Sequence, residues 1–269
     1  MVGRGRGRPV AEERDVVVPR PGHAPLRAAL YRSPHPAAST VVAIHGMSPL
    51  AERDPRWVQL CRGICRAGLT VVSPHFESVS QLRIMADQPT EFANAARAVC
   101  DSPDLSPAGR VGLLSVSFSG GLTIAAAASP PLRHRVSAVC AIGGYADLPN
   151  CLRSIFTDED ADPYALLIVL ANFIQGDAGP LTGAHEALFR AARANFTDAT
   201  IDPRDHFGEL PPATRTMLHG LLGDRDQRLT QLHRLMTRCA DTVAALNPID
   251  LIAGLQAPVT LLHGARDDV

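Results

Sequence analysis

One serine stands in a setting that could make it a nucleophile. Residues 112–121 read GLLSVSFSGG, in which an apolar run leads into Ser117 and small residues follow. A strand that turns sharply into a helix exposes such a hydroxyl, provided that the residues two before and two after it are small, as Ser115 and Ser119 are. A helix that begins at Phe118 would aim its first amides at the oxyanion formed when the serine attacks a carbonyl group. The spacing therefore predicts a nucleophile for acyl transfer.

Two further segments carry groups that this chemistry requires. His45, Gly46 and Met47 follow a continuous apolar run at 40–44, which is typical of a strand buried on both faces. A loop at the end of such a strand can present backbone amides to an oxyanion. Late in the chain, residues 257–268 read APVTLLHGARDD, an apolar strand followed by a turn with two aspartates. In chain order the three segments offer amide donors, a nucleophile and a carboxylate.

In this order the segments resemble the α/β-hydrolases, and the chain looks like an esterase or dienelactone hydrolase of that family. Serine stands at both positions where the family's Gly-x-Ser-x-Gly signature has glycine. The resemblance implies that Ser117 is the nucleophile and that the backbone N–H groups of Met47 and Phe118 form the oxyanion hole. The supporting residues that it implies are His45, Gly46 and Gly120. Taken alone, the segment 112–121 is also compatible with serines that cap a buried helix.

The same resemblance places the acid of a catalytic triad at Asp267, with its neighbour Asp268 as the alternative. Asp147, just beyond the apolar run 136–142, occupies a second acid position known in some members of the family. Taken alone, two aspartates after a glycine form an ordinary solvated turn. His45 is expected to support its loop rather than act as the base, because the family's chain order is nucleophile, acid, base.

A base for the triad is missing from the expected place. All ten histidines precede Asp267, whereas the resemblance implies a histidine some tens of residues after it. We therefore expect that the sequence is C-terminally truncated and lacks its last strand and helix, and that it hydrolyses esters poorly as written. His75, which follows the apolar run 69–72, is a remote substitute. A stop codon directly after Val269 in independent isolates would contradict the truncation.

The elements that must position these residues alternate between apolar β-rich runs and helical periods. This alternation predicts an α/β fold, a mostly parallel sheet flanked by helices with a helical cap insertion. The predicted strands are 15–18, 26–31, 40–44, 69–72, 111–114, 136–142 and 259–262. The predicted helices are 56–66, 90–99, 122–128, 164–175, 185–195, 214–222 and 227–246.

Three regions follow from this pattern. Residues 13–146 and 248–269 are expected to form the α/β-hydrolase core, and 147–247 the helical cap insertion. Residues 1–12 are rich in Gly and Arg and are expected to be a disordered tail. Within the tail, residues 6–9 resemble the core of an AT-hook, but one copy is weak and we expect no nucleic-acid partner.

Composition excludes several other classes. The chain has 26 basic and 27 acidic residues, so no net field favours nucleic acid or an anionic membrane. The N-terminal arginines precede no apolar stretch of the kind that a secretory signal has, and we expect a cytoplasmic protein without a membrane partner. The six cysteines show no metal-ligand spacing, so no metal and no cofactor are expected.

The expected function is hydrolysis of a carboxylic ester or related small-molecule acyl substrate through an acyl-enzyme. Apolar residues of the insertion would line the acyl site, although such stripes are more often simple core. The candidates are Phe156, Leu166, Leu170, Phe173 and Phe189. The alternative is a non-catalytic α/β-hydrolase-like ligand-binding protein, which the absent histidine favours. Neither the substrate nor the oligomeric state follows from the sequence.

Overall fold

The structure is a computed structural model, and it describes residues 12–20, 22, 24–35, 39–158, 162–174, 181 and 183–264. The predicted tail lies outside the described residues except for Glu12, which is the first residue of a strand and not part of a tail. Asp267 and Asp268, the two candidates for the acid in the last turn, also lie outside the described residues.

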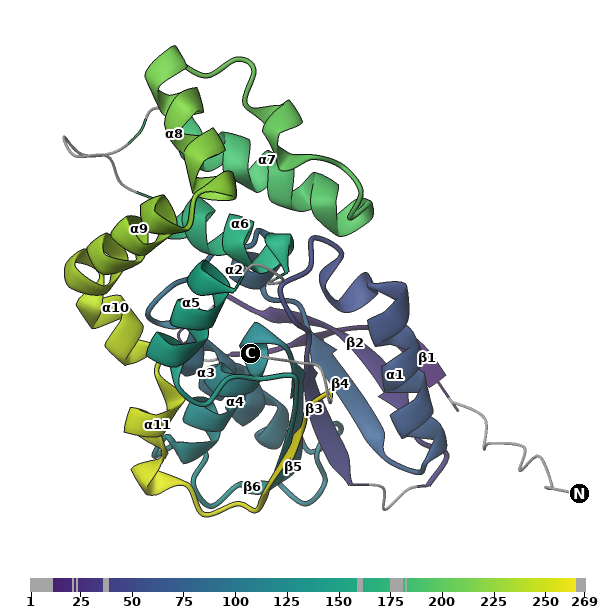
Figure 1. The fold of residues 1–269 in the computed structure, drawn as a ribbon. Coiled ribbons are helices and arrows are strands. Elements are labelled where there is room, and N and C mark those ends of the chain that lie inside the picture. Colours follow the sequence, from purple (N-terminus) through teal and green to yellow (C-terminus); the bar gives the residue numbers. More distant parts are fainter. Residues whose placement is uncertain are drawn as a thin grey trace, which may run out of the picture.

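Seven strands form one sheet in the order β1-β2-β4-β3-β5-β6-β7 (Figure 1). The pairs β1–β2 and β2–β4 are antiparallel, and all other pairs are parallel. The strands are β1 (Glu12–Val18), β2 (Leu26–Arg32), β3 (Thr40–Ile44), β4 (Thr70–Pro74), β5 (Val111–Val116), β6 (Val136–Ile142) and β7 (Val259–Leu262). The predicted fold class, a mostly parallel sheet flanked by helices, is confirmed.

Both faces of the sheet are covered, because the central strands are apolar on both sides. On β3, Val42 and Ile44 face the larger core, which includes residues of helices α3 (Gln88–Cys100) and α4 (Phe118–Ala128). Ala43 faces a smaller core with α1 (Pro55–Arg66). A continuous apolar run such as 40–44 is therefore what this position in the sheet requires.

Between β6 and β7 the chain forms a series of helices, and Figure 1 shows α5, α6 and α7 over one end of the sheet. The further α-helices are α2 (Glu77–Ser80), α5 (Leu148–Thr157), α6 (Pro163–Phe173), α7 (Ala184–Thr197), α8 (Pro212–Gly223), α9 (Arg225–Arg238), α10 (Ala240–Ala245) and α11 (Pro248–Leu251). The 3₁₀ turns are Ala51–Arg53, Pro203–His206 and Ile252–Gly254. Of the described helices, none is both long and apolar enough to cross a bilayer.

Two helical segments differ from the sequence prediction. The helix α5 was not predicted, although Asp147 caps it and Pro149 stands in its first turn. The single helix predicted over 227–246 is divided at Cys239, whose φ of −115° and ψ of 23° lie outside the helical region. The division turns α10 so that Val243 reaches the cavity described below.

Candidate active site

Ser117 occupies the sharp turn between β5 and α4. Its φ of 55° and ψ of −140° lie where residues other than glycine are rarely found, at a cost of about 1–3 kcal/mol. Two backbone bonds hold the turn: the Ser117 N–H donates to Ile142 O at 2.8 Å, and the Gly120 N–H donates to Ser117 O at 2.7 Å. The surrounding chain therefore stabilises a backbone conformation that lifts this hydroxyl out of both the strand and the helix.

Small residues around Ser117 allow the turn to pack tightly. Ser115 and Ser119 are both fully buried, and the Ser119 hydroxyl donates to His45 O at 2.7 Å. A Cβ atom placed on Gly120 would lie 2.7 Å from the Cα of Gly144, so the start of α4 touches the backbone after β6. Any larger residue at position 120 would push these two segments apart.

The loop after β3 packs directly on the serine. A Cβ atom on Gly46 would lie 3.2 Å from the Cβ of Ser117. The backbone N–H groups of Met47 and Phe118 donate to no backbone acceptor among the described residues. Two amides on either side of a hydroxyl, both without an acceptor, can stabilise an oxyanion that forms there.

His45 lies beneath this loop. The His45 ring contacts Gly46 O through Nδ1 at 2.9 Å, and burial lowers the pKa of the imidazole, which favours its neutral form. Its Nε2 is buried and has no hydrogen-bond partner among the described residues. His45 makes no hydrogen bond with Ser117, as expected of a residue that supports the loop.

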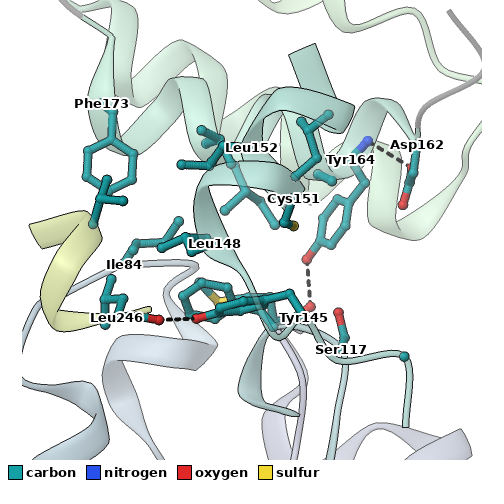
Figure 2. Close-up of a pocket in the computed structure, with 18 of the residues that line it drawn as sticks. Ile84, Ser117, Tyr145, Leu148, Cys151, Leu152, Asp162, Tyr164, Phe173 and Leu246 are labelled. Atoms are coloured by element: carbon teal, nitrogen blue, oxygen red, sulfur yellow. Dashed lines mark hydrogen bonds between the residues drawn. The ribbon is translucent and has the colours of Figure 1, made fainter. Parts of the chain in front are cut away.

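An apolar cavity of about 420 Å³ opens at Ser117 (Figure 2). Tyr145 lies across its floor, and the Tyr145 hydroxyl donates to Leu246 O at 3.0 Å, so this polar atom is satisfied. We call this cavity the apolar chamber. Its walls are Met47, Ile84, Val116, Phe118, Ile142, Gly143, Tyr145, Leu148, Cys151, Leu152, Ile155, Tyr164, Ala165, Ile168, Val169, Phe173, Val243 and Leu246, with Asp162 and Thr242.

A second cavity of about 470 Å³ also opens at Ser117, and its lining is more polar. We call it the polar chamber. Its residues are His45, Gly46, Met47, Ser48, Ala51, Asp54, Arg56, Trp57, Leu60, Val116, Ser117, Asp162, Tyr164, Asn195, Phe196 and Ala199. Ser117 and Tyr164 line both chambers, and the Tyr164 hydroxyl donates to Met47 O at 3.0 Å. Tyr164 therefore ties α6 to the loop beside the serine.

Charges in the polar chamber are largely paired. Asp54 caps α1 by accepting from the Arg56 N–H at 2.9 Å, and the Arg56 guanidinium donates to its carboxylate at 2.8 Å. This hydrogen bonding with Arg56 holds the pKa of Asp54 below its usual range. The same guanidinium lies 5.3 Å from the ring centroid of Phe196. Asp162 caps α6 in the same way, accepting from the Tyr164 N–H at 2.9 Å.

The structure brings together all of the predicted site residues that it describes: Ser117, Met47, Phe118, His45, Gly46 and Gly120. Asp147, the alternative acid, does not line either chamber, because it caps α5 by accepting from the Asn150 N–H at 3.0 Å. Tyr164, Asp162 and Asn195 were not identified from the sequence. An Asp-Pro pair at 162–163 signals the helix start, but no signal in the sequence shows that this start reaches the serine.

Four of the five residues predicted to line the acyl site do not line the apolar chamber. Phe173 lines the apolar chamber, whereas the other four candidates pack into the hydrophobic core, for the reason that apolar helix stripes usually do. The four are Phe156, Leu166, Leu170 and Phe189. The walls come instead from the unpredicted helix α5 and from α6 and α10.

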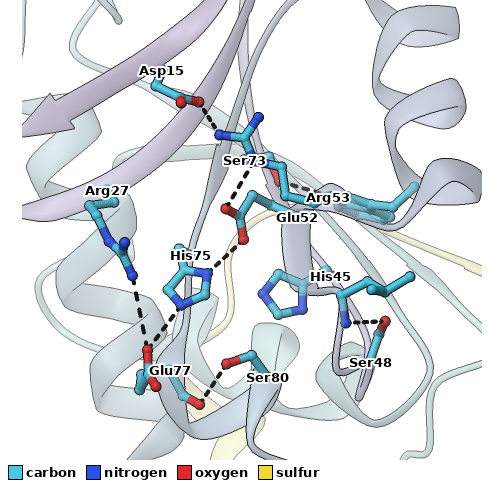
Figure 3. A network of polar contacts seen from close by, with 12 residues as sticks. Asp15, Arg27, His45, Ser48, Glu52, Arg53, Ser73, His75, Glu77 and Ser80 are labelled. Atoms are coloured by element: carbon cyan, nitrogen blue, oxygen red, sulfur yellow. Dashed lines mark hydrogen bonds and ion pairs between the residues drawn. The ribbon is translucent and has the colours of Figure 1, made fainter.

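His75 belongs to a separate polar network (Figure 3). Its Nδ1 lies 2.7 Å from a carboxylate oxygen of Glu52, and its Nε2 lies 3.1 Å from Glu77. Both ring nitrogens are thus engaged, and His75 lines neither chamber. The structure gives no support to His75 as a substitute base.

Replacing His75 by alanine is expected to lower the free energy of unfolding by about 1–3 kcal/mol. The change leaves the buried carboxylate of Glu52 with Arg53 as its remaining partner, at 3.5 Å. Urea unfolding measures the loss, with Glu77→Ala as the matched control, because Glu77 is exposed and should cost less than about 0.5 kcal/mol. Covalent labelling of Ser117 should be unchanged in folded His75→Ala protein, and its loss would show that His75 serves the serine.

No group of three or more His, Cys, Asp or Glu residues suited to a metal ion occurs in the described part of the chain.

No protein-family model matches this chain, and no curated protein matches it. Solved structures are similar to it. A dienelactone hydrolase from Anabaena variabilis is 20% identical, with a TM-score of 0.44, over 69% of this chain and 97% of that one. An esterase from Pyrobaculum calidifontis is 17% identical, with a TM-score of 0.48, over 96% and 78%. A putative thioesterase from Silicibacter sp. is 14% identical, with a TM-score of 0.49, over 96% and 69%. At these identities the likeness concerns the fold alone.

Proposed function

We propose that this chain, which has the α/β-hydrolase fold, is a serine hydrolase that acts on esters of apolar acids. The observation that carries the proposal is the position of Ser117, in a strained turn where an apolar and a polar chamber meet. An ester has an acid part and an alcohol part on either side of the carbon that is attacked. A nucleophile between two unlike chambers suits such a substrate.

In the proposed reaction the Ser117 hydroxyl attacks the ester carbonyl, and the acyl group enters the apolar chamber. The N–H groups of Met47 and Phe118 stabilise the oxyanion, each contributing about 3 kcal/mol to the lowering of the barrier. The alcohol leaves through the polar chamber with a proton, and water then releases the acid from the acyl-enzyme. We assign α5, α6 and α10 to a cap over the acyl group.

The proton of Ser117 needs a base, and no histidine among the described residues is bonded to Ser117. We propose Asp267 as the acid of the triad, because it stands at the position that the resemblance to the α/β-hydrolases implies. Among the described histidines only His45 lines a chamber, and its burial, which lowers the pKa of the imidazole, favours the supporting role. Turnover by this chain is therefore expected to be slow, and a covalent probe is a more sensitive assay than turnover.

The test is labelling with a fluorophosphonate, which forms a covalent bond with an activated serine. We expect labelling of the purified chain, with the modified peptide mapping to Ser117 by mass spectrometry. p-Nitrophenyl esters with acyl chains of two to sixteen carbons should compete with the probe for Ser117. Esters of medium chain length should slow the labelling most, because a cavity of about 420 Å³ accepts a chain of limited length. Labelling at any other serine would contradict the proposal.

Tyr164→Phe tests the link between the cap and the oxyanion loop. The change removes the hydroxyl that donates to Met47 O and keeps the ring that packs at 5.7 Å from Phe196. Because the Met47 peptide loses one of its anchors, we expect about a tenfold slower rate of labelling by fluorophosphonate and less than a twofold change in the affinity of an apolar probe. If the labelling rate and the affinity of the apolar probe fell by the same factor, Tyr164 would only shape the chamber.

The second candidate is a non-catalytic ligand-binding protein, favoured by the absence of a histidine bonded to Ser117 among the described residues. It makes a different prediction. Apolar ligands would bind in the chamber, but no serine would be labelled, and Ser117→Ala would leave their affinity unchanged.

A further inference from the structure

One buried amide in the polar chamber has no partner. Asn195 of α7 lines this chamber and is only 5% exposed, yet its side chain makes no hydrogen bond with any described residue. The amide nitrogen and oxygen of Asn195 are not among the fully buried polar atoms that lack a partner, so they face the open space of the chamber, where a primary amide can both donate and accept. A polar ligand atom in the chamber can form hydrogen bonds with this amide, which no described residue engages.

The charges around Asn195 favour a neutral ligand. The guanidinium of Arg56 is engaged by Asp54, and a second carboxyl group, that of Asp162, stands at the junction with the apolar chamber. Among the described residues that line this chamber, no other arginine is present. A phosphate or carboxylate would thus find no unpaired cation and would face two carboxyl groups, whereas a hydroxyl group would not be repelled.

The lining also fits a hydroxylated group. The aromatic rings of the lining are those of Trp57, Tyr164 and Phe196. The polar atoms come from Ser48, Asp54 and Asn195. Polyols carry C–H surface that packs on aromatic rings and hydroxyls that both donate and accept. The apolar chamber, which also opens at Ser117, offers no comparable set of polar groups.

We propose that the polar chamber binds a neutral, hydroxylated alcohol through Asn195, so that the preferred substrates are esters of an apolar acid with a polyol such as glycerol. The inference rests on the proposed function, because it takes Ser117 as the atom between acid and alcohol. It goes beyond that function in naming the alcohol and the residue that selects it.

The experiment compares two ligands that cannot be hydrolysed. One is 1-O-octylglycerol, and the other is octyl propyl ether, which has the same skeleton without the two hydroxyls. Calorimetry measures the dissociation constant of each with the wild-type chain and with Asn195→Leu. We expect Asn195→Leu to weaken the glycerol ether about tenfold, the factor for one lost hydrogen bond, and the propyl ether less than twofold.

Three further variants keep the result interpretable. Ile155 lines only the apolar chamber, so Ile155→Ala should weaken both ethers by a similar factor. Thr197→Ala, at the exposed end of α7 and outside both chambers, should affect neither. If Asn195→Leu fails to fold, Asn195→Asp replaces it, since this change keeps the size and removes the amide donors.

The outcomes separate the two proposals. Equal weakening of both ethers by Asn195→Leu, or no weakening of the glycerol ether, would overturn the inference about the alcohol. Because neither ether reacts, this result does not depend on catalysis. Failure of the fluorophosphonate to label Ser117 would overturn the proposed function and leave the binding preference measurable.

Discussion

Replacing Ser117 by alanine will reduce fluorophosphonate labelling of this chain to background and will remove its ester hydrolysis. The hydroxyl at this position is the one that the strained turn lifts to the junction of the two chambers. In enzymes with a complete triad, loss of the nucleophile costs up to about a millionfold in turnover. Gel fluorescence measures the labelling, and p-nitrophenol release measures the turnover.

The matched control is Ser115→Ala, two residues earlier on β5. The Ser115 hydroxyl is buried and has no partner among the described residues, so its removal should leave the free energy of unfolding equal or higher. Alanine is also small enough for the turn. Labelling that persists in Ser117→Ala, or that disappears in a well-folded Ser115→Ala, would count against Ser117 as the nucleophile.

Gly120→Ala is expected to lower the free energy of unfolding by at least about 2 kcal/mol, although alanine is normally the better helix former. The new Cβ would lie 2.7 Å from the Cα of Gly144, and backbone on both sides leaves no flexible side chain to move. The displaced segment includes Gly143 and Tyr145, which line the apolar chamber. Urea unfolding measures the stability. The dissociation constant of octyl propyl ether shows whether the apolar chamber still binds its ligand.

Gly63→Ala provides the comparison. Gly63 lies within α1, one turn before its last residue, and a Cβ atom there would meet nothing within 4 Å. The intrinsic helix preference then acts alone, and we expect the variant to be more stable by about 0.5–1 kcal/mol. If both glycine variants changed stability by the same amount, the close approach of α4 to the loop after β6 would not be a constraint.

The sheet could be predicted because its strands are short apolar runs between clear breaks. The run 40–44 matches β3, and 136–142 matches β6, to the residue. The sequence prediction lacks helix α5, although Asp147 and Pro149 are typical of a helix start. It assigns Asp147 to a possible catalytic acid, whereas in the structure the Asp147 carboxylate is the N-cap of α5. The break at Cys239 has no glycine or proline to mark it, so it depends on tertiary packing.

The candidate site could be predicted where it depends on local sequence and not where it depends on packing. The turn at Ser117 and the loop at Gly46 follow from small residues at fixed spacing next to apolar strands. Tyr164 lies more than a hundred residues from Met47 in the chain, and only the fold brings its hydroxyl to that carbonyl. Apolar helix residues in the insertion are alike in sequence, and packing alone decides which of them face a cavity.

Trp57 is the only tryptophan in the sequence, and it stands in the wall of the polar chamber with its indole N–H donating to Ser73 Oγ at 2.8 Å. Its intrinsic fluorescence therefore originates from one known place. A guest that displaces water from that wall should change the emission maximum or intensity of the protein. Occupancy of this half of the cleft can thus be followed in real time, without a dye and without turnover.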